Sequence, residues 1–299
     1  MARAEARPAR DVIRTSEPPR LNVLRRAGEL LRHRELIGNL TAKELKVKYK
    51  STALGVIWSM LNPLLYLIVF WLVFTIFLPS GIPDFAIYLL SGLLGYTLFS
   101  TGLQGATSSV VESAALVTKV AFPREILPLS AIGASLVNFF YQFLVLVAFM
   151  VVVGHSFLGP ELLLVPFALV VLLLLLTALG MGAAAANVRY RDTRHLVELS
   201  LIAWFWVTPV VYSAQLVLDR LGPVAEGFYL ANPLTAVTLA FQRALYGNRL
   251  MTDGVPVLPD PGIAWYAMRL GFVALASLVL LSLTWRAFFR MSGDFAEEL

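Results

Sequence analysis

The chain has no cysteine and only three histidines among its 299 residues. Disulfides and thiolate metal sites are therefore excluded. The histidines, His33, His155 and His195, lie too far apart in sequence to favour a structural zinc site. No Gly-Lys-Ser or Gly-Lys-Thr occurs anywhere, so the chain lacks the phosphate-binding loop that ATPases use to hold a nucleotide. We expect no cofactor in this chain and no ATP hydrolysis by it.

Charged residues are also scarce, at 14% of the chain against 58% hydrophobic residues, whereas soluble domains carry about 25% charged residues. Four long stretches contain no Asp, Glu, Lys or Arg, and they lie between Lys50 and Asp84, Asp84 and Glu112, Glu125 and Glu161, and Glu161 and Arg189. A helix needs roughly 20 residues to cross a hydrocarbon core of about 30 Å. Each stretch is long enough to cross, and four such stretches together exclude a soluble fold. They also argue against an ion-coupled transporter, because such proteins place ionisable groups inside their spans.

The sequence predicts an all-α integral membrane protein with six transmembrane helices. The predicted spans are 56–78, 85–108, 127–153, 161–186, 197–213 and 264–286. Arg269 falls in the last span, near the outer surface, where its side chain can snorkel.

Basic residues indicate the topology, because short loops rich in Lys and Arg stay in the cytoplasm. Residues 1–55 hold 13 Lys and Arg residues, and the loops at 109–126 and 187–196 are also basic. The loops at 79–84 and 154–160 contain none. This pattern predicts an even number of spans with both termini in the cytoplasm. No apolar run precedes Val56, so a cleaved signal peptide is not expected.

The chain divides into three predicted parts. Residues 1–20 read as a disordered basic tail and 21–50 as an amphipathic cytoplasmic interface helix, followed by a six-helix transmembrane domain over 51–299. The apolar face of the interface helix consists of Val23, Leu24, Ala27, Leu30 and Leu31. Membrane lipids, rather than nucleic acid, are the expected partner of the basic end. The same helix also suits binding to a partner subunit.

Two loops are longer than connections need to be. Residues 110–127 predict a short exposed helix and a turn at Pro123, either as a docking element or as an interfacial turn. Residues 213–262 form a long outer segment in which Pro233–Tyr246 has helical character. About 14 helical residues cover only about 21 Å, too little for a full crossing. We expect re-entrant helices between the fifth and sixth spans, with an ordinary outer cap as the alternative.

Aromatic residues recur on the first, second and fifth predicted spans. They include Tyr66, Phe70 and Phe74, then Phe85, Tyr88 and Tyr96, and finally Trp204, Phe205, Trp206 and Tyr212. Belts of Trp and Tyr at the membrane interfaces account for many such residues. The alternative is a lining that guides a sugar polymer, because aromatic faces stack on sugar rings.

Several motifs together resemble permeases of ABC-type polysaccharide exporters, over about residues 30 to 299. These are Lys48–Trp58 with Asn62-Pro63, Val120–Pro128, Arg191-Asp192, Pro209–Tyr212, Asn232-Pro233 and the final Phe295-Ala-Glu. Each motif is weak alone, and their order makes the set specific. Lys48 stands where Arg is frequent in the family, which keeps the charge.

This resemblance implies a homodimer of six-helix subunits in the bacterial cytoplasmic (inner) membrane. A separate nucleotide-binding ATPase subunit would bind ATP and Mg, and the cargo would be a lipid-linked glycan such as O antigen, teichoic acid or galactan. The residues expected to couple to that subunit are Glu112, Lys119, Pro123, Arg124 and Glu125. The aromatic residues expected to line the conduit are Tyr66, Phe70, Tyr88, Tyr96, Trp204 and Trp206.

Two other functions stay open at this point. One is an ABC exporter of drugs or small lipids. The other is a membrane-embedded glycan-modifying enzyme, which would need carboxylates or histidines that converge near the surface. Candidates such as Asp84 and Asp192 are isolated in the sequence.

Overall fold

The computed structural model describes residues 23–49, 57–77, 81–120, 122–259 and 261–299. The named elements in this part of the chain are all helices, joined by loops. The predicted tail at 1–20 and part of the Lys48–Trp58 motif lie outside the described residues. The elements are α1 Val23–Arg32, α2 Arg34–Tyr49, α3 Ile57–Leu72, the π-helical turn η1 Val73–Phe77, α4 Phe85–Glu112, α5 Ala114–Lys119, α6 Ile126–Val153, the 3₁₀ turn η2 Pro160–Leu163, α7 Leu164–Arg189, α8 Thr193–Val207, α9 Ala214–Leu218, α10 Pro223–Ala231, α11 Pro233–Leu245, α12 Ile263–Met291 and α13 Phe295–Glu298.

Four helical segments in the described part of the chain are long and apolar enough to cross a membrane. They are α4, α6, η2 with α7, and α12, each of 28 to 30 residues. At 1.5 Å per residue they extend about 42–45 Å, which exceeds a hydrocarbon core of about 30 Å. These helices confirm the second, third, fourth and sixth predicted spans and make this a multi-pass membrane protein.

The other two predicted spans are shorter helices. The first corresponds to α3, of 16 residues, continued by the π-helical turn η1. The fifth corresponds to α8, which runs Thr193–Val207 instead of 197–213. The helix ends at Thr208, whose backbone is extended. A residue that precedes a proline disfavours helical backbone angles, and Pro209 itself has no N–H to continue the helical hydrogen bonds.

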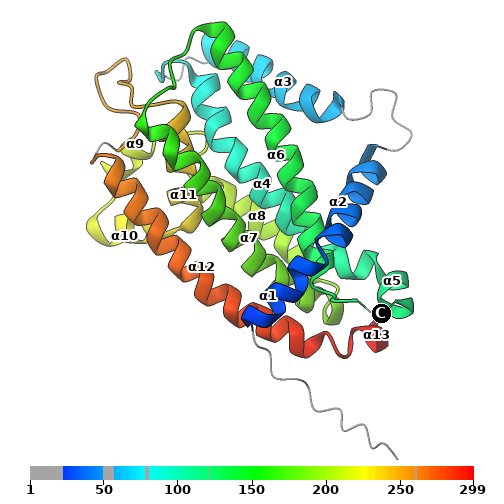
Figure 1. Cartoon of the computed structure of the whole chain (residues 1–299). Helices are drawn as coiled ribbons and strands as arrows, with labels where there is room; N and C mark the ends of the chain where they lie inside the picture. Colours follow the sequence, from blue (N-terminus) through cyan, green and yellow to red (C-terminus); the bar gives the residue numbers. More distant parts are fainter. Residues whose placement is uncertain (1–22, 50–56, 78–80, 121, 260) are drawn as a thin grey trace, which may run out of the picture.

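Helix α4 lies at the centre and packs against α6, α7, α8 and α11 (Figure 1). Glycines on α4 let the neighbouring helices approach closely. A Cβ at Gly102 would lie 2.6 Å from a methyl carbon of Leu176 in α7, and one at Gly92 would lie 2.7 Å from the amide nitrogen of Gln242 in α11. Small residues at such contacts are typical of helix packing in membranes, where van der Waals contact drives association.

Helix α11 is the predicted short helix at 233–246, and it is enclosed by α4, α7, α10 and α12. Pro233 occupies its first turn, and the Asn232 side chain accepts a hydrogen bond from the backbone N–H of Leu234 at 3.1 Å. Almost every side chain from Leu234 to Leu245 is buried. Its 13 residues cover about 20 Å, so α11 is a short helix inside the bundle and not a complete crossing.

The predicted interface helix at 21–50 is two helices, α1 and α2, separated by a turn at His33. Leu30 is buried against the bundle, whereas Leu31 is 73% exposed. Helix α2 packs against α6, where Thr41 Oγ1 donates to the carbonyl of Ser130 at 3.3 Å. Figure 1 shows α1, α2, α5 and α13 gathered at one end of the bundle, with α9 and the 247–259 loop at the other.

Candidate functional site

A strip of hydroxyl and amide side chains runs along one face of α4. It consists of Thr97, Ser100, Thr101, Gln104 and Ser108, and we call it the polar strip. At 100° per residue these positions fall within about 100° of the helix circumference. Thr101 and Gln104 are exposed, and the other three are partly buried.

The polar strip runs from the middle of the membrane-spanning helix α4 toward its C-terminal end. Hydrocarbon at this depth offers no hydrogen-bond partners. Thr101 and Ser108 hydroxyls donate to carbonyls one turn earlier, at 2.7 and 3.1 Å. Thr97 Oγ1 also donates to Gln142 Oε1 of α6 at 2.9 Å. Polar side chains at this depth usually face a water-filled path or another protein surface, because exposure to lipid leaves the amide of Gln104 without partners.

Two hollows flank the polar strip. One, of about 350 Å³, lies between α3, α4 and α6 and is lined by Tyr66, Phe70, Thr97 and Gln142 among others. The other, of about 290 Å³, lies between α4 and α8, and its lining includes Tyr96, Ser100, Gln104, Glu198, Phe205 and Trp206. Aromatic residues from α3 and α8 therefore stand on either side of the hydroxyl and amide groups of α4.

Three of the aromatic residues predicted to line a conduit are accessible at these hollows. Tyr66 is 56% exposed and Trp206 is 64% exposed. Phe70 is partly buried, and its ring stacks on Tyr66 with centroids 6.1 Å apart. Their rings offer flat apolar faces next to hydrogen-bonding groups.

The other three have structural contacts. Tyr88 and Tyr96 are buried, and their hydroxyls donate to the backbone carbonyls of Tyr212, at 2.6 Å, and of Leu201. Trp204 is partly buried, and its indole N–H donates to Asn232 Oδ1 at 2.8 Å. These bonds hold α8 and the loop after it against α4 and α11. Tyr96 also lines the hollow between α4 and α8, whereas Tyr88 and Trp204 line neither of the two hollows and hold the elements around them.

The polar strip itself was missed by sequence reasoning, which followed the aromatic residues. Its signal is present in the sequence: Thr97, Thr101, Gln104 and Ser108 repeat at intervals of three and four within a stretch that has no charge. Gln142 of α6 carries no comparable signal, because only the packing of α6 on α4 brings it to Thr97.

The loop between α4 and α6 has the predicted form of a short helix followed by a turn at Pro123. Helix α5 exposes Lys119, and Glu112 at the end of α4 is also exposed. Pro123 and Arg124 are partly buried, and the Arg124 guanidinium lies 5.9 Å from the ring centroid of Phe295. Burial lowers the pKa of Arg124, and the charge of Glu125 opposes that effect.

Glu125 differs from the other predicted coupling residues, because its side chain is only 1% exposed. It accepts hydrogen bonds from Arg26 of α1, at 2.9 and 3.2 Å, and from the indole of Trp285 of α12, at 3.4 Å. Burial lowers the pKa of Arg26, but the bonds to Glu125 and Glu29 outweigh it, so the pKa is raised. Glu125 thus fastens the loop to α1 and α12 and presents no surface to a partner.

A helical bundle that crosses the membrane several times, with the polar strip on the outer face of α4 and an exposed short helix at one end, is the architecture of a membrane transport subunit. The chain belongs to the ABC-2 type transporter family, whose sequence profile matches residues 35–246. That region includes the polar strip, the loop between α4 and α6, and α11.

Curated relatives support the same assignment. The chain is 34% identical over 240 residues to the O-antigen export system permease protein RfbA of Myxococcus xanthus, covering 79% of this chain and 89% of that protein. Two proteins of Klebsiella pneumoniae have the same name. One is 26% identical over 232 residues, which cover 77% of this chain and 87% of that protein. The other is 25% identical over 224 residues, which cover 75% of this chain and 85% of that protein.

Proposed function

We propose that this chain is the transmembrane subunit of an ATP-driven exporter of lipid-linked polysaccharide. It works as a homodimer with a separate ATPase subunit, which binds ATP and Mg, in the bacterial cytoplasmic membrane. The observation that carries this proposal is the uncharged polar strip of α4 between two hollows with aromatic walls. The names of the relatives, O-antigen export permeases, support the polysaccharide cargo.

A polymer in transit must be held weakly at many points, because tight binding at one point would stop it from sliding. Hydroxyl and amide groups exchange hydrogen bonds with sugar hydroxyls, each with a net value of about 0.5–1.5 kcal/mol. Aromatic faces add apolar contact without the desolvation cost of a charge. From Thr97 to Ser108 the strip extends about 16 Å along the helix axis, long enough to contact several sugar units in succession.

The apolar surfaces of α3 and α8 support a homodimer around the polar strip. Much of the described surface of α3 is exposed, including Leu65 and Val69, and α8 exposes Leu199 and Ile202. Both helices flank the strip on α4. A second copy that covers these faces would enclose the strip between two subunits and shield it from lipid.

The proposed topology has six spans: α3 with η1, α4, α6, α7, α8 and α12. Helices α10 and α11 are the re-entrant pair on the outer side, and both termini are cytoplasmic. The ATPase subunit docks at α5, where exposed Glu112 and Lys119 offer one charge of each sign. The buried bonds of Glu125 then carry a movement of this loop to α1 and α12.

Replacing Thr101 and Gln104 together, by Val and Leu, tests this function. The changes remove hydrogen-bonding groups with little change in volume, so the export of glycan by cells should fall about two- to tenfold. Membrane insertion and basal ATP hydrolysis of the assembled complex should stay the same.

Thr177→Val is the matched control. Thr177 also lies within a spanning helix, and its hydroxyl donates to the carbonyl of Leu173 at 2.7 Å, but it belongs to α7 and not to the polar strip. Export equal to wild type in the Thr101 and Gln104 variant, or an equal loss in the control, would contradict the proposed path.

A further inference from the structure

A third hollow, of about 760 Å³, opens beside α12, and its walls come from α7, α10, α11 and α12. Helix α7 packs against α12 on one side and against α4 on the other (Figure 1). The hollow is therefore separate from the polar strip. Its lining is largely apolar, with Leu175, Val273 and Leu280 among the residues that contribute.

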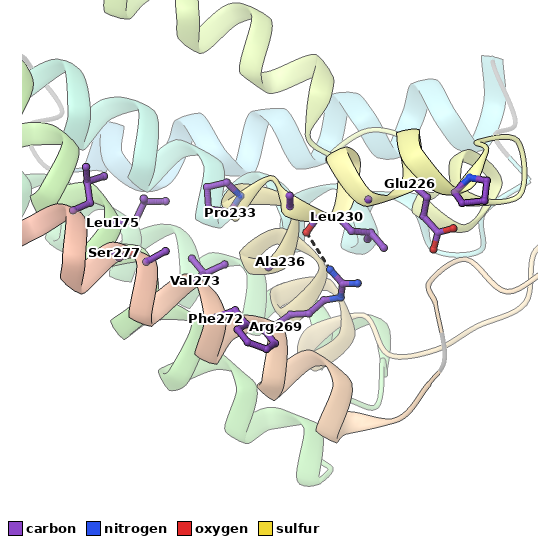
Figure 2. A pocket seen from close by; sticks show the side chains of 14 residues that line it. Leu175, Glu226, Leu230, Pro233, Ala236, Arg269, Phe272, Val273 and Ser277 are labelled. Atoms are coloured by element: carbon purple, nitrogen blue, oxygen red, sulfur yellow. Dashed lines mark hydrogen bonds between the residues drawn. The ribbon is translucent and has the colours of Figure 1, made fainter.

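Arg269 of α12 places a cation at the α10 end of this hollow. Figure 2 shows its side chain turned toward α10, where Nη1 donates to the carbonyl of Leu230 at 3.1 Å. The guanidinium also lies 4.3 Å from the ring centroid of Trp265. Arg269 thus reaches the outer segment, near the surface predicted from the sequence, and these two contacts fix its position.

Two polar atoms at this hollow lack partners in the described structure. Arg269 Nε is buried without a hydrogen-bond partner, and so is the hydroxyl of Ser277, further along the same wall. Buried donors without partners cost free energy. The wall of the hollow therefore carries polar groups whose hydrogen bonds the protein itself does not satisfy. The carboxylate of Glu226 faces the same space from α10 (Figure 2).

The dimensions of the hollow match one leaflet of a membrane. From Arg269 to Leu280 the α12 axis advances about 16 Å, and half of a hydrocarbon core of about 30 Å is about 15 Å. Phe272, Leu275 and Val279 of α12 are exposed apolar residues near the hollow. The hollow therefore lies on a face suited to hydrocarbon, with its cation at one end and apolar walls along the depth of one leaflet.

We propose that this hollow binds one anionic phospholipid of the surrounding membrane. Its phosphate lies at Arg269, where a guanidinium forms strong charge-assisted hydrogen bonds, and an acyl chain lies along Val273, Ala276 and Leu280. The bound lipid fills the space between α10 and α12 and holds the outer segment against the bundle. This assignment goes beyond the proposed export function and is independent of the cargo.

Native mass spectrometry of the purified full-length subunit tests the assignment, with phosphatidylglycerol and phosphatidylcholine as probes. The wild-type subunit should retain one phosphatidylglycerol molecule, with a preference over phosphatidylcholine of roughly tenfold. A preference of this size is expected from one hydrogen bond to a charged group. Arg269→Gln should abolish this preference. Ala276→Phe fills the hollow at an exposed position, so it should reduce retention of both lipids while leaving Arg269 in place.

Matched controls separate the site from general effects of charge and bulk. Arg220→Gln removes an exposed arginine elsewhere in the outer segment, and Leu275→Phe enlarges an exposed residue of α12 that does not line the hollow. Both should retain lipid as wild type does. Glu226→Gln removes the carboxylate that faces the phosphate, so it should increase the retention of phosphatidylglycerol.

Competition identifies the occupant. Glycerol phosphate, which has no acyl chain, and a long-chain isoprenoid phosphate should each fail to displace phosphatidylglycerol at equal concentration. Displacement by glycerol phosphate would make this a free-phosphate site, and displacement by the isoprenoid would make it a site for carrier lipid; either result overturns the proposal. Unchanged lipid retention in both Arg269→Gln and Ala276→Phe would overturn it as well.

Discussion

At the scale of single residues, Asn232 joins α8, α10 and α11. Its Oδ1 caps α11 through the N–H of Leu234 and accepts from the Trp204 indole, while its Nδ2 donates to Thr208 Oγ1 at 3.3 Å. One amide therefore connects the end of α8 to the start of the buried helix. Asn can do this because its short side chain carries an acceptor oxygen and a separate donor nitrogen.

Asn232→Ala should lower the stability of the bundle by about 2–3 kcal/mol, because it removes an N-cap and leaves the Trp204 N–H without its acceptor. The thermal unfolding midpoint of the purified subunit measures this effect. Gln215→Ala serves as the control, since its amide bonds to Asp219 at an exposed site, and its midpoint should stay near wild type. A wild-type midpoint for Asn232→Ala would show that the connection is not stabilising.

The pair of Arg26 and Glu125 supports a second prediction at this scale. Glu125→Gln keeps the shape of the side chain but removes its charge, so it should destabilise the protein by about 1–3 kcal/mol. A double-mutant cycle with Arg26→Gln should show a coupling of about 1 kcal/mol or more. Unfolding midpoints supply the four values of the cycle.

Glu112→Gln is the control for this pair, because Glu112 is exposed and single exposed charges contribute little to stability. Purely additive effects of Glu125→Gln and Arg26→Gln would mean that the two side chains do not act as a pair in the protein.

At the scale of helices, the sequence was most informative where the hydrophobic pattern was uninterrupted. The charge-free stretches predicted α4, α6 and α7, and the apolar run at 264–286 predicted α12 although it contains Arg269. Pro233–Tyr246 predicted α11, and Asn232 with Pro233 mark its start, since a cap followed by proline is a strong local signal. The division of the N-terminal segment into α1 and α2 was not predicted. Helix α2 packs on α6 through residues about 90 positions further along the chain, a contact that the local sequence does not reveal.

The roles of aromatic and acidic residues were harder to predict. An aromatic residue in an apolar run gives the same pattern whether it faces lipid, the core or a path, so Tyr66 and Tyr88 were equivalent in the sequence although one is exposed and the other buried. The burial of Glu125 follows from Arg26, a partner 99 positions away. Local patterns do not contain such pairings.

The helix α5 and its flanks carry a prediction at this scale. Reversing the exposed charges, by Glu112→Lys with Lys119→Glu, should weaken docking of an ATPase subunit by charge repulsion and reduce export in cells. Membrane insertion and the thermal midpoint of the subunit should not change, because both side chains are exposed.

Arg220→Glu is the control for charge reversal, since Arg220 is exposed on the outer segment, beyond the proposed reach of the ATPase subunit. Co-purification of the ATPase subunit measures docking directly. Normal co-purification and export in the doubly reversed variant would leave α5 as a simple connection between α4 and α6.

At the scale of the whole molecule, the two ends of the bundle differ in composition. Helices α1, α2, α5 and α13 gather at the end where basic residues are frequent, and α9 and the 247–259 loop lie at the other end (Figure 1). This asymmetry agrees with the predicted orientation, in which the basic end is cytoplasmic.

The absence of cysteine from the sequence makes this orientation testable with single substitutions. Cysteine introduced at the exposed position Ser156 should react with a membrane-impermeant thiol reagent added to intact cells, and cysteine at the exposed position Thr118 should react only after the membrane is opened. Labelling of Thr118→Cys in intact cells would contradict the proposed orientation.

The polar strip of α4 lies on the outside of one subunit, and this has a consequence for how a cargo would enter. A polymer with a bulky anchor at one end is difficult to thread through a continuous ring. In the proposed homodimer the conduit would be formed by two subunits that meet at the edges made by α3 and α8. Such a junction can open without unfolding either subunit. We therefore expect the lipid anchor to enter laterally from the bilayer, and the sugar chain to follow it into the conduit.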